Sequence, residues 1–248
     1  MNVRTHFLPG AGAALLVAIL STPAPAQTAA ATSDLVTIIH VKPDMLQEFL
    51  ELEKNIIPAL KKGGEESRTV YVTSIFGNAY EYVSVTPIQH FSMFDGQNPL
   101  LKALSQPATA RLTEQMRKVV DGTTTFVSTS IPEISYMPEG PPPAILVQVR
   151  YRIAPGKMQD FINLMKSDVL PVYKKANVEV TVRRRSVGAN PNDVVMSSAL
   201  TKYGDLEGGP FLTKQLGAEA SNRINAKFTG IRTVMEVVVR RRVDELSF

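Results

Sequence analysis

The feature that most constrains the fold of this chain is an internal repeat. Residues 144–175 have the pattern of one β-strand, a tight turn at Pro155 and one amphipathic helix, and a weaker copy occupies residues 36–62. When Pro43 is aligned with Pro155, residues of similar chemistry coincide along both segments. The matched pairs are Gln47 with Gln159, Phe49 with Phe161, Leu52 with Leu164, Lys54 with Lys166 and, after one gap, Pro58 with Pro171. The sequence therefore predicts a tandem duplication with one structural unit in each half.

The first 26 residues have the pattern of a secretory signal peptide. Arg4 precedes an apolar run over residues 11–20, and Ala24 and Ala26 form an Ala-x-Ala cleavage pattern. The run has about half of the roughly 20 residues that a membrane-spanning helix needs, which favours cleavage after Ala26 over an uncleaved anchor. No comparable run occurs later in the sequence. We therefore expect a periplasmic or secreted protein with no membrane contact after cleavage.

The composition narrows the chemistry that this chain can support. Its 248 residues, 44% of them hydrophobic, suffice for two small domains. The absence of cysteine excludes disulfides, thiolate metal sites and cysteine nucleophiles. A net charge of only +4, with no Trp and 7% aromatic residues, argues against nucleic acid as a partner. The three histidines have no metal-binding spacing, so the sequence predicts neither a metal nor a cofactor.

The first unit is predicted to have the order βαββαβ. Its first helix carries an apolar stripe that is interrupted by Glu53, and Pro58 is expected to bend or end this helix. Gly77-Asn78 lies between two β-rich segments and indicates a hairpin. The predicted strands cover residues 35–41, 69–75, 80–85 and 123–130, and the second helix covers residues 109–120.

The second unit repeats this order after a proline-rich linker. The linker covers residues 137–143, so we assign residues 27–136 and 144–248 to the two domains. The predicted strands of the second domain cover residues 145–153, 178–187, 194–200 and 231–241, and the helices cover residues 156–175 and 211–228. Each half is thus expected to be an α+β unit of the ferredoxin-like type.

Each such unit has helices on one face of its sheet only. The two uncovered faces must meet an apolar surface or each other. The two halves are therefore expected to pair their sheets within one chain, as a pseudo-dimer. This arrangement favours a monomer, and the remaining edge strands leave a homo-oligomer open.

The second unit resembles a known protein family. Residues 149–161, with the sequence VRYRIAPGKMQDF, followed by Leu170-Pro171 and by residues 203–206, YGDL, are similar to a NIPSNAP-type domain of the dimeric α/β-barrel superfamily. The resemblance covers essentially the mature chain as two copies and is weaker in the first, where Asp44 replaces the turn glycine. It implies a pseudo-symmetric α/β barrel. It does not select a reaction, because the superfamily includes cofactor-free monooxygenases, haem enzymes and proteins without assigned activity.

The polar face of the second unit is the candidate ligand site. Strand alternation separates an aliphatic face, which should hold the helices, from a face rich in arginine. Arginine forms bidentate pairs with planar oxyanions, so this face is predicted to bind a small anionic, amphipathic molecule between the two units. The alternative is that Glu179 and Glu236 pair with these arginines. The candidate ligand-binding residues are Gln148, Arg150, Arg152, Arg183 and Arg185.

The catalytic candidate is His40, at the end of the first predicted strand. It would act as the base of a cofactor-free oxygenase or isomerase while Arg150 or Arg152 holds an anion. Haem ligation by His40 or His90 is a second role that these residue types permit. A strand-end histidine without chemistry is the simpler interpretation. The sequence therefore leaves three hypotheses: a binding protein, an enzyme, and a structural or oligomerising protein with a filled barrel.

Overall fold

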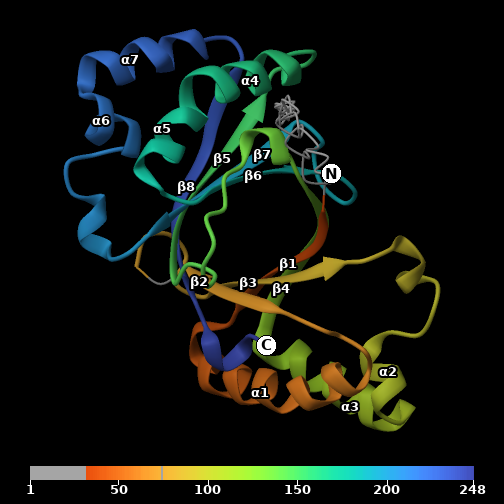
Figure 1. Ribbon diagram of the computed structural model, residues 1–248. Coiled ribbons are helices and arrows are strands. Elements are labelled where there is room, and N and C mark those ends of the chain that lie inside the picture. Colours follow the sequence, from red (N-terminus) through yellow and green to blue (C-terminus); the bar gives the residue numbers. More distant parts are fainter. Residues whose placement is uncertain (1–31, 74) are drawn as a thin grey trace, which may run out of the picture.

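The protein has an eight-stranded barrel at its centre. The structure, a computed structural model, describes residues 32–73 and 75–248, and the predicted signal peptide, residues 1–26, lies outside the described residues. The strands are β1 (Ser33–Val41), β2 (Thr69–Thr73), β3 (Glu81–Ile88), β4 (Val120–Ser130), β5 (Ile145–Ile153), β6 (Val180–Arg185), β7 (Asp193–Leu200) and β8 (Arg232–Arg242). Within the described residues they close in the order β1-β3-β2-β8-β5-β7-β6-β4 (Figure 1).

Helices cover the outside of the barrel. The first half contributes α1 (Leu46–Lys62), α2 (Pro99–Ala103) and α3 (Gln106–Val119), and the second contributes α4 (Met158–Leu164), α5 (Leu170–Ala176), α6 (Phe211–Leu216) and α7 (Ala218–Lys227). The helices of the two halves lie on opposite sides of the barrel (Figure 1). The predicted fold is confirmed: two ferredoxin-like units pair their sheets within one chain.

The two halves meet at short seams. Each half forms four adjacent strands, β4-β1-β3-β2 and β8-β5-β7-β6, which are equivalent orders of an antiparallel sheet. The first seam pairs residues 71–73 of β2 with residues 240–242 of β8. The second pairs residues 128–130 of β4 with residues 183–185 of β6. Because these ladders are short, side-chain contacts across them carry part of the closure.

An aromatic residue anchors the helices of each half to the outer face of its sheet. Phe49 of α1 packs against Tyr82 of β3, with 4.9 Å between the ring centroids. The repeat partner Phe161 of α4 lies 6.2 Å from Tyr151 and 5.9 Å from Phe228. Both phenylalanines are essentially inaccessible to solvent. Full burial of such a side chain contributes about 1.5–3 kcal/mol, which explains why the repeat retains this position.

Three helix predictions need correction. Pro58 does not end α1, which continues to Lys62, because its side chain is exposed and costs the helix only one internal hydrogen bond. The helix predicted over residues 156–175 contains a π-helical turn, Met165–Val169, directly before the Leu170-Pro171 step. Proline has no N–H for the i→i−4 hydrogen bond, so the regular α-helical pattern is interrupted next to Pro171. The helix predicted over residues 211–228 is broken at Gly217, whose φ of +81° suits glycine.

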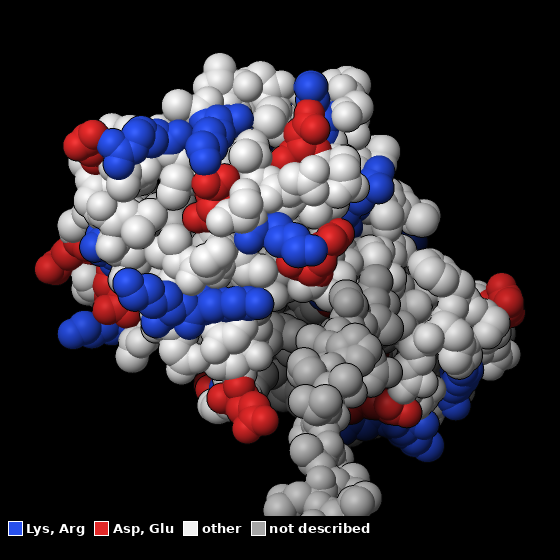
Figure 2. Space-filling view, turned by 45° about the horizontal axis from the view of Figure 1, so that its top comes forward, with Lys and Arg blue, Asp and Glu red and all other residues white. Residues whose placement is uncertain are grey.

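The surface carries both signs of charge. On the face shown in Figure 2, lysine and arginine are interspersed with aspartate and glutamate. Nucleic-acid contacts usually require an extended basic patch, which this face does not present. Among the described residues, no helix is both long enough and apolar enough to cross a membrane.

Candidate functional site

The five predicted ligand-binding residues all face the interior of the barrel. Gln148 lies opposite Ser197 of β7 and donates a 3.0 Å hydrogen bond to its hydroxyl. The next inward residues of β5 are Arg150 and Arg152. From β6, Arg183 and Arg185 reach the same space next to Ser128 and Ser130 of β4. Strand alternation thus placed these residues on the correct face, and ligand binding by them stays a prediction.

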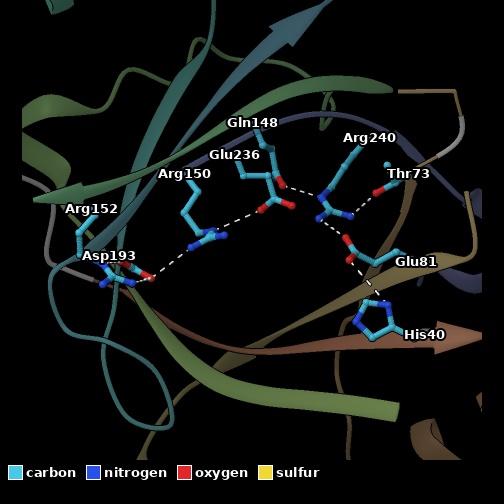
Figure 3. Close-up of polar contacts among 9 residues, drawn as sticks. All are labelled: His40, Thr73, Glu81, Gln148, Arg150, Arg152, Asp193, Glu236 and Arg240. Atoms are coloured by element: carbon cyan, nitrogen blue, oxygen red, sulfur yellow. Dashed lines mark hydrogen bonds and ion pairs between the residues drawn. The ribbon is translucent and has the colours of Figure 1, made fainter. Parts of the chain in front are cut away.

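Most of these arginines pair with carboxylates of the barrel (Figure 3). Nε of Arg150 lies 3.2 Å from Oε2 of Glu236, and its Nη1 lies 3.5 Å from Oδ2 of Asp193. Arg152 shares Asp193 and forms a hydrogen-bonded ion pair with it. The predicted pairing with Glu236 is therefore present. Glu179, by contrast, has no ion pair within the described part of the chain, and burial raises the pKa of its carboxyl group.

Two further arginines connect the halves across the seams. Nη2 of Arg183 lies 2.6 Å from Oδ2 of Asp34 on β1. Arg240 donates from Nη2 to Glu81 at 2.5 Å, from Nη1 to Thr73 at 2.6 Å and from Nε to Gln148 at 2.7 Å (Figure 3). Thr73 and Glu81 belong to the first half, so Arg240 hydrogen-bonds to both units. Much of the interior polarity thus serves to hold the barrel together.

His40 lies at one end of the barrel interior. Its Nδ1 is 3.8 Å from Oε2 of Glu81, and its side chain is 40% exposed. Glu81 is already bonded to Arg240. The other described histidine, His90, is exposed and contacts Ser92 at 2.7 Å. Neither histidine lines the cavity described next, so a base or ligand role for His40 stays a prediction.

A cavity lies outside the barrel, in the second half. It has a volume of about 650 Å³ and lies between the outer face of β5, β7 and β8 and the helices α5, α6 and α7. Ligand pockets commonly have volumes of about 300–1,000 Å³. Its apolar walls include Val147, Val149, Met196, Phe211, Leu212 and Val237. The aliphatic face that was predicted to hold the helices is therefore only partly covered by them.

A β-bulge shapes this cavity. The register between β5 and β8 shifts at Arg150, so that Glu236 faces Arg150 while Val234 faces Tyr151. Val234 and Val237 consequently both line the cavity although they are three residues apart. They are 56% and 58% exposed, which marks the open side of the cavity. Contiguous apolar surface that stays exposed can mark a binding site.

Arg232 is a cationic group that lines the cavity beside Tyr151 and Phe228. Its guanidinium group contacts two rings, with its Cζ 4.4 Å from the centroid of Tyr151 and 3.8 Å from that of Phe228. Its Nη2 donates to Oδ1 of Asn225 at 3.0 Å. Among the described residues no carboxylate forms an ion pair with Arg232, and burial lowers the pKa of its guanidinium group. Sequence reasoning missed this residue, because the bulge breaks the alternation that identifies the faces of β8.

Tyr173 supplies a hydroxyl group to the same cavity. It follows the π-helical turn, stacks on Phe211 with 4.1 Å between centroids, and hydrogen-bonds to Ser198 at 3.0 Å. Burial raises the pKa of Tyr173 to about 12, so the phenol stays neutral and can donate a proton in a hydrogen bond. The cavity therefore offers a cation and a neutral hydroxyl to a ligand.

The cavity contains no strong base in its described lining. Its carboxylate, Asp205, accepts hydrogen bonds from the amides of Lys202 and Thr201, and these bonds lower the pKa of Asp205. Lys214 donates to the carbonyl oxygen of Asp205. A carboxylate with a lowered pKa is a poor proton acceptor near neutral pH. The geometry thus suits the binding of an anion better than the removal of a proton by the protein.

Solved structures with the same architecture identify the fold. An anthrone oxidase-like protein matches with a TM-score of 0.58 and 10% identity, over 86% of this chain and 91% of its own. A candidate monooxygenase from Lactobacillus acidophilus matches with a TM-score of 0.52 and 10% identity, over 86% and 93%. The fold is the dimeric α/β barrel. No protein-family model matches the sequence, and no curated protein matches it either.

Another structural match is described as a haem-binding protein. It comes from Thermus thermophilus and has a TM-score of 0.50 and 11% identity, over 87% of this chain and 93% of its own. Haem iron is usually held by histidine or by a cysteine thiolate. The chain has no cysteine, and the described lining of the cavity contains no histidine. The raised pKa of Tyr173 also disfavours a tyrosinate ligand. The cavity of this chain therefore does not fit haem.

An ion pair connects α7 to the π-helical turn beside the cavity. Nζ of Lys227 lies 2.7 Å from Oδ1 of Asp168, and this hydrogen bond lowers the pKa of Asp168. A carboxyl group whose pKa is lower in the folded state stabilises the fold above its unfolded pKa and loses this effect as the pH falls through its folded pKa.

Asp168→Asn is therefore expected to lower the free energy of unfolding by about 0.5–1 kcal/mol near pH 7, because Lys227 is half exposed. The difference from wild type should shrink as the pH falls below the unfolded pKa of about 4 and should disappear once the pH is below the lowered pKa of the folded state. Urea unfolding near pH 7 and in acid measures the difference in the free energy of unfolding between the variant and wild type. Asp160→Asn, at an exposed pair with Lys157, is the matched control and should change stability less. A difference for Asp168→Asn that persists in acid would contradict the assignment.

Proposed function

We propose that this protein binds a small amphipathic acid in the cavity beside Arg232. The observation that carries the proposal is a partly buried guanidinium group that has no carboxylate partner among the described residues, at one wall of a mainly apolar cavity. A ligand with an apolar ring system and one carboxylate, enolate or phenolate group matches both properties. The ring system would cover Val234 and Val237, and the anionic oxygen would accept hydrogen bonds from Arg232.

The electrostatics of the cavity support an anion over a neutral ligand. The rings of Tyr151 and Phe228 contact the guanidinium group, and a hydrogen bond to Asn225 uses one of its five N–H donors. The remaining donors lie in the plane of the group, where a bidentate oxyanion binds. Burial lowers the pKa of Arg232, so its charged form gains from a counterion.

A cofactor-free oxygenase is the second candidate. An anionic, enolised aromatic substrate would find a cation in Arg232 and a hydroxyl donor in Tyr173. The structural matches named above, a candidate monooxygenase and an anthrone oxidase-like protein, are compatible with it. The cavity has a poor base in its described lining, so such a substrate would have to enter as the anion. Binding alone therefore ranks first.

The test compares naphthoic acid with its uncharged analogue naphthamide by titration calorimetry. Wild type is expected to bind the acid more tightly than the amide, and Arg232→Gln should reduce that preference about tenfold or more, because a charge-assisted hydrogen bond contributes about 1.5–3 kcal/mol. Arg232→Lys keeps the charge and should retain part of the preference. Arg223→Gln on α7, where Arg223 is exposed and pairs with Glu219, is the control and should behave as wild type.

Two outcomes separate the hypotheses. Equal binding of acid and amide by wild type, or an unchanged preference in Arg232→Gln, would rule out Arg232 as the anion site. An oxygen electrode run with the same protein and a polycyclic phenol tests the second candidate. Oxygen consumption that Arg232→Gln loses and Arg223→Gln retains would favour the oxygenase over a binding protein.

A further inference from the structure

The barrel interior contains a guanidinium group that the pairing network leaves out. Among the described residues, the inward arginines 150, 152, 183 and 240 each have a carboxylate within ion-pair distance. Arg185 has none. Its Nε is buried and has no hydrogen-bond partner in the described part of the chain. Arg185 lies in the barrel interior and is separate from the outer cavity beside Arg232.

Arg185 is held in place by an aromatic ring. Its guanidinium group lies 4.3 Å from the centroid of Phe126, which belongs to the interior apolar cluster with Val36 and Val83. Its backbone pairs with Ser128 across the seam between β6 and β4. The ring packs against the guanidinium group, and it offers no oxygen or nitrogen acceptor to the N–H donors. Arg185 is therefore positioned, but its hydrogen bonds are not satisfied by the protein.

The neighbouring charges do not compensate Arg185. Burial, and next the positive charge of Arg150, lower its pKa, and the carboxylates of Asp193 and Glu236 oppose this only partly. Those two carboxylates are already bonded to Arg150 and Arg152. A buried cation that lacks a counterion carries a desolvation cost, which a bound anion removes.

We propose that the barrel interior binds a small oxyanion at Arg185, with the anion accepting hydrogen bonds from the in-plane donors of the guanidinium group. The shared chemistry is a compact group with two oxygens in one plane, as in a carboxylate, phosphate or sulfate. The contact with Phe126 restricts the motion of the guanidinium group before an anion binds. This site lies between the two halves, beside the seam that β4 and β6 form.

The test is thermal unfolding of the full chain with rising concentrations of sodium sulfate, sodium phosphate or sodium acetate, each in a chloride background of constant ionic strength. Wild type should show a saturable rise in unfolding temperature with at least one of these oxyanions. A rise with sulfate or phosphate indicates an inorganic anion, and a rise with acetate indicates a carboxylate. Arg185→Gln should lose this rise. Arg184→Gln is the matched control, because Arg184 is the next residue on the strand and is exposed on the opposite face.

A second readout separates binding from a structural role. Without oxyanion, at low ionic strength, Arg185→Gln should unfold at the same temperature as wild type or a higher one, because an uncompensated charge has been removed. Arg185→Lys keeps the charge without the planar fork and should bind the anion about tenfold more weakly. A wild type without any saturable shift, or the same shift in Arg185→Gln, would overturn the proposal. Arg232→Gln should keep the shift, which distinguishes this site from the outer cavity.

Discussion

Replacing Glu53 with alanine is expected to lower the free energy of unfolding by about 3–5 kcal/mol. Glu53 is 2% exposed, and its Oε2 lies 2.6 Å from Nη2 of Arg68, which is 5% exposed. Nε of Arg68 donates to the hydroxyl of Ser84 at 2.8 Å. Without Glu53 the guanidinium charge stays buried, with Ser84 as its remaining side-chain partner among the described residues. Urea unfolding followed by circular dichroism measures the change.

Two variants test the cause of this loss. Glu51→Ala removes an exposed carboxylate from the same helix and should change stability by no more than about 0.5 kcal/mol. The double substitution Glu53→Leu with Arg68→Met removes both charges and should be much more stable than Glu53→Ala, because no unpaired charge is left in the core. A double variant that is as unstable as Glu53→Ala would show that lost packing, and not the unpaired charge, causes the effect.

The repeat was enough to predict the fold because it fixes local pattern and order together. The strand, turn and helix around Pro155 occur again around Pro43, and each copy predicts its own four-stranded sheet. Glu53 shows the limit of this reasoning. Its place in an apolar stripe was visible in the sequence, but its partner Arg68 lies in the connection before β2, outside any regular pattern. Tertiary contacts decide such pairings.

The candidate site also has parts that the sequence predicts and parts that it does not. Strand alternation identified the inward residues of β5 and β6, because regular strands alternate their faces strictly. It did not anticipate that Asp34, Glu81 and Asp193 pair with interior arginines, since each comes from another strand. Nor did it locate the outer cavity, which depends on a bulge in β8 and on the break between α6 and α7. Irregular backbone of this kind leaves little trace in the apolar pattern.

The second large effect is expected at the seam between β2 and β8. Arg240→Met should lower the free energy of unfolding by about 3–5 kcal/mol, because Arg240 is 5% exposed and its removal leaves Glu81, Thr73 and Gln148 without their common donor. Thermal and urea unfolding measure the loss. Glu81→Gln in the Arg240→Met background should recover part of it, since a neutral amide is less costly to leave unpaired than a carboxylate.

Because Arg240 lies at a seam between the two halves, its removal also tests whether the seam opens before either half unfolds. Arg241 is the next residue on β8, and its side chain is exposed. Arg241→Met therefore removes the same charge and keeps the hydrogen bonds of Arg240, and it should change stability by no more than about 0.5 kcal/mol. Among the described residues, the β2–β8 ladder at this seam pairs residues 71–73 with residues 240–242. If Arg240 is the main side-chain connection there, Arg240→Met should also raise amide hydrogen exchange in β2 and β8 before it does so in the core of either half. Uniform exchange across the molecule would instead mean that the barrel opens only by global unfolding, with the seam as stable as the two units that it joins.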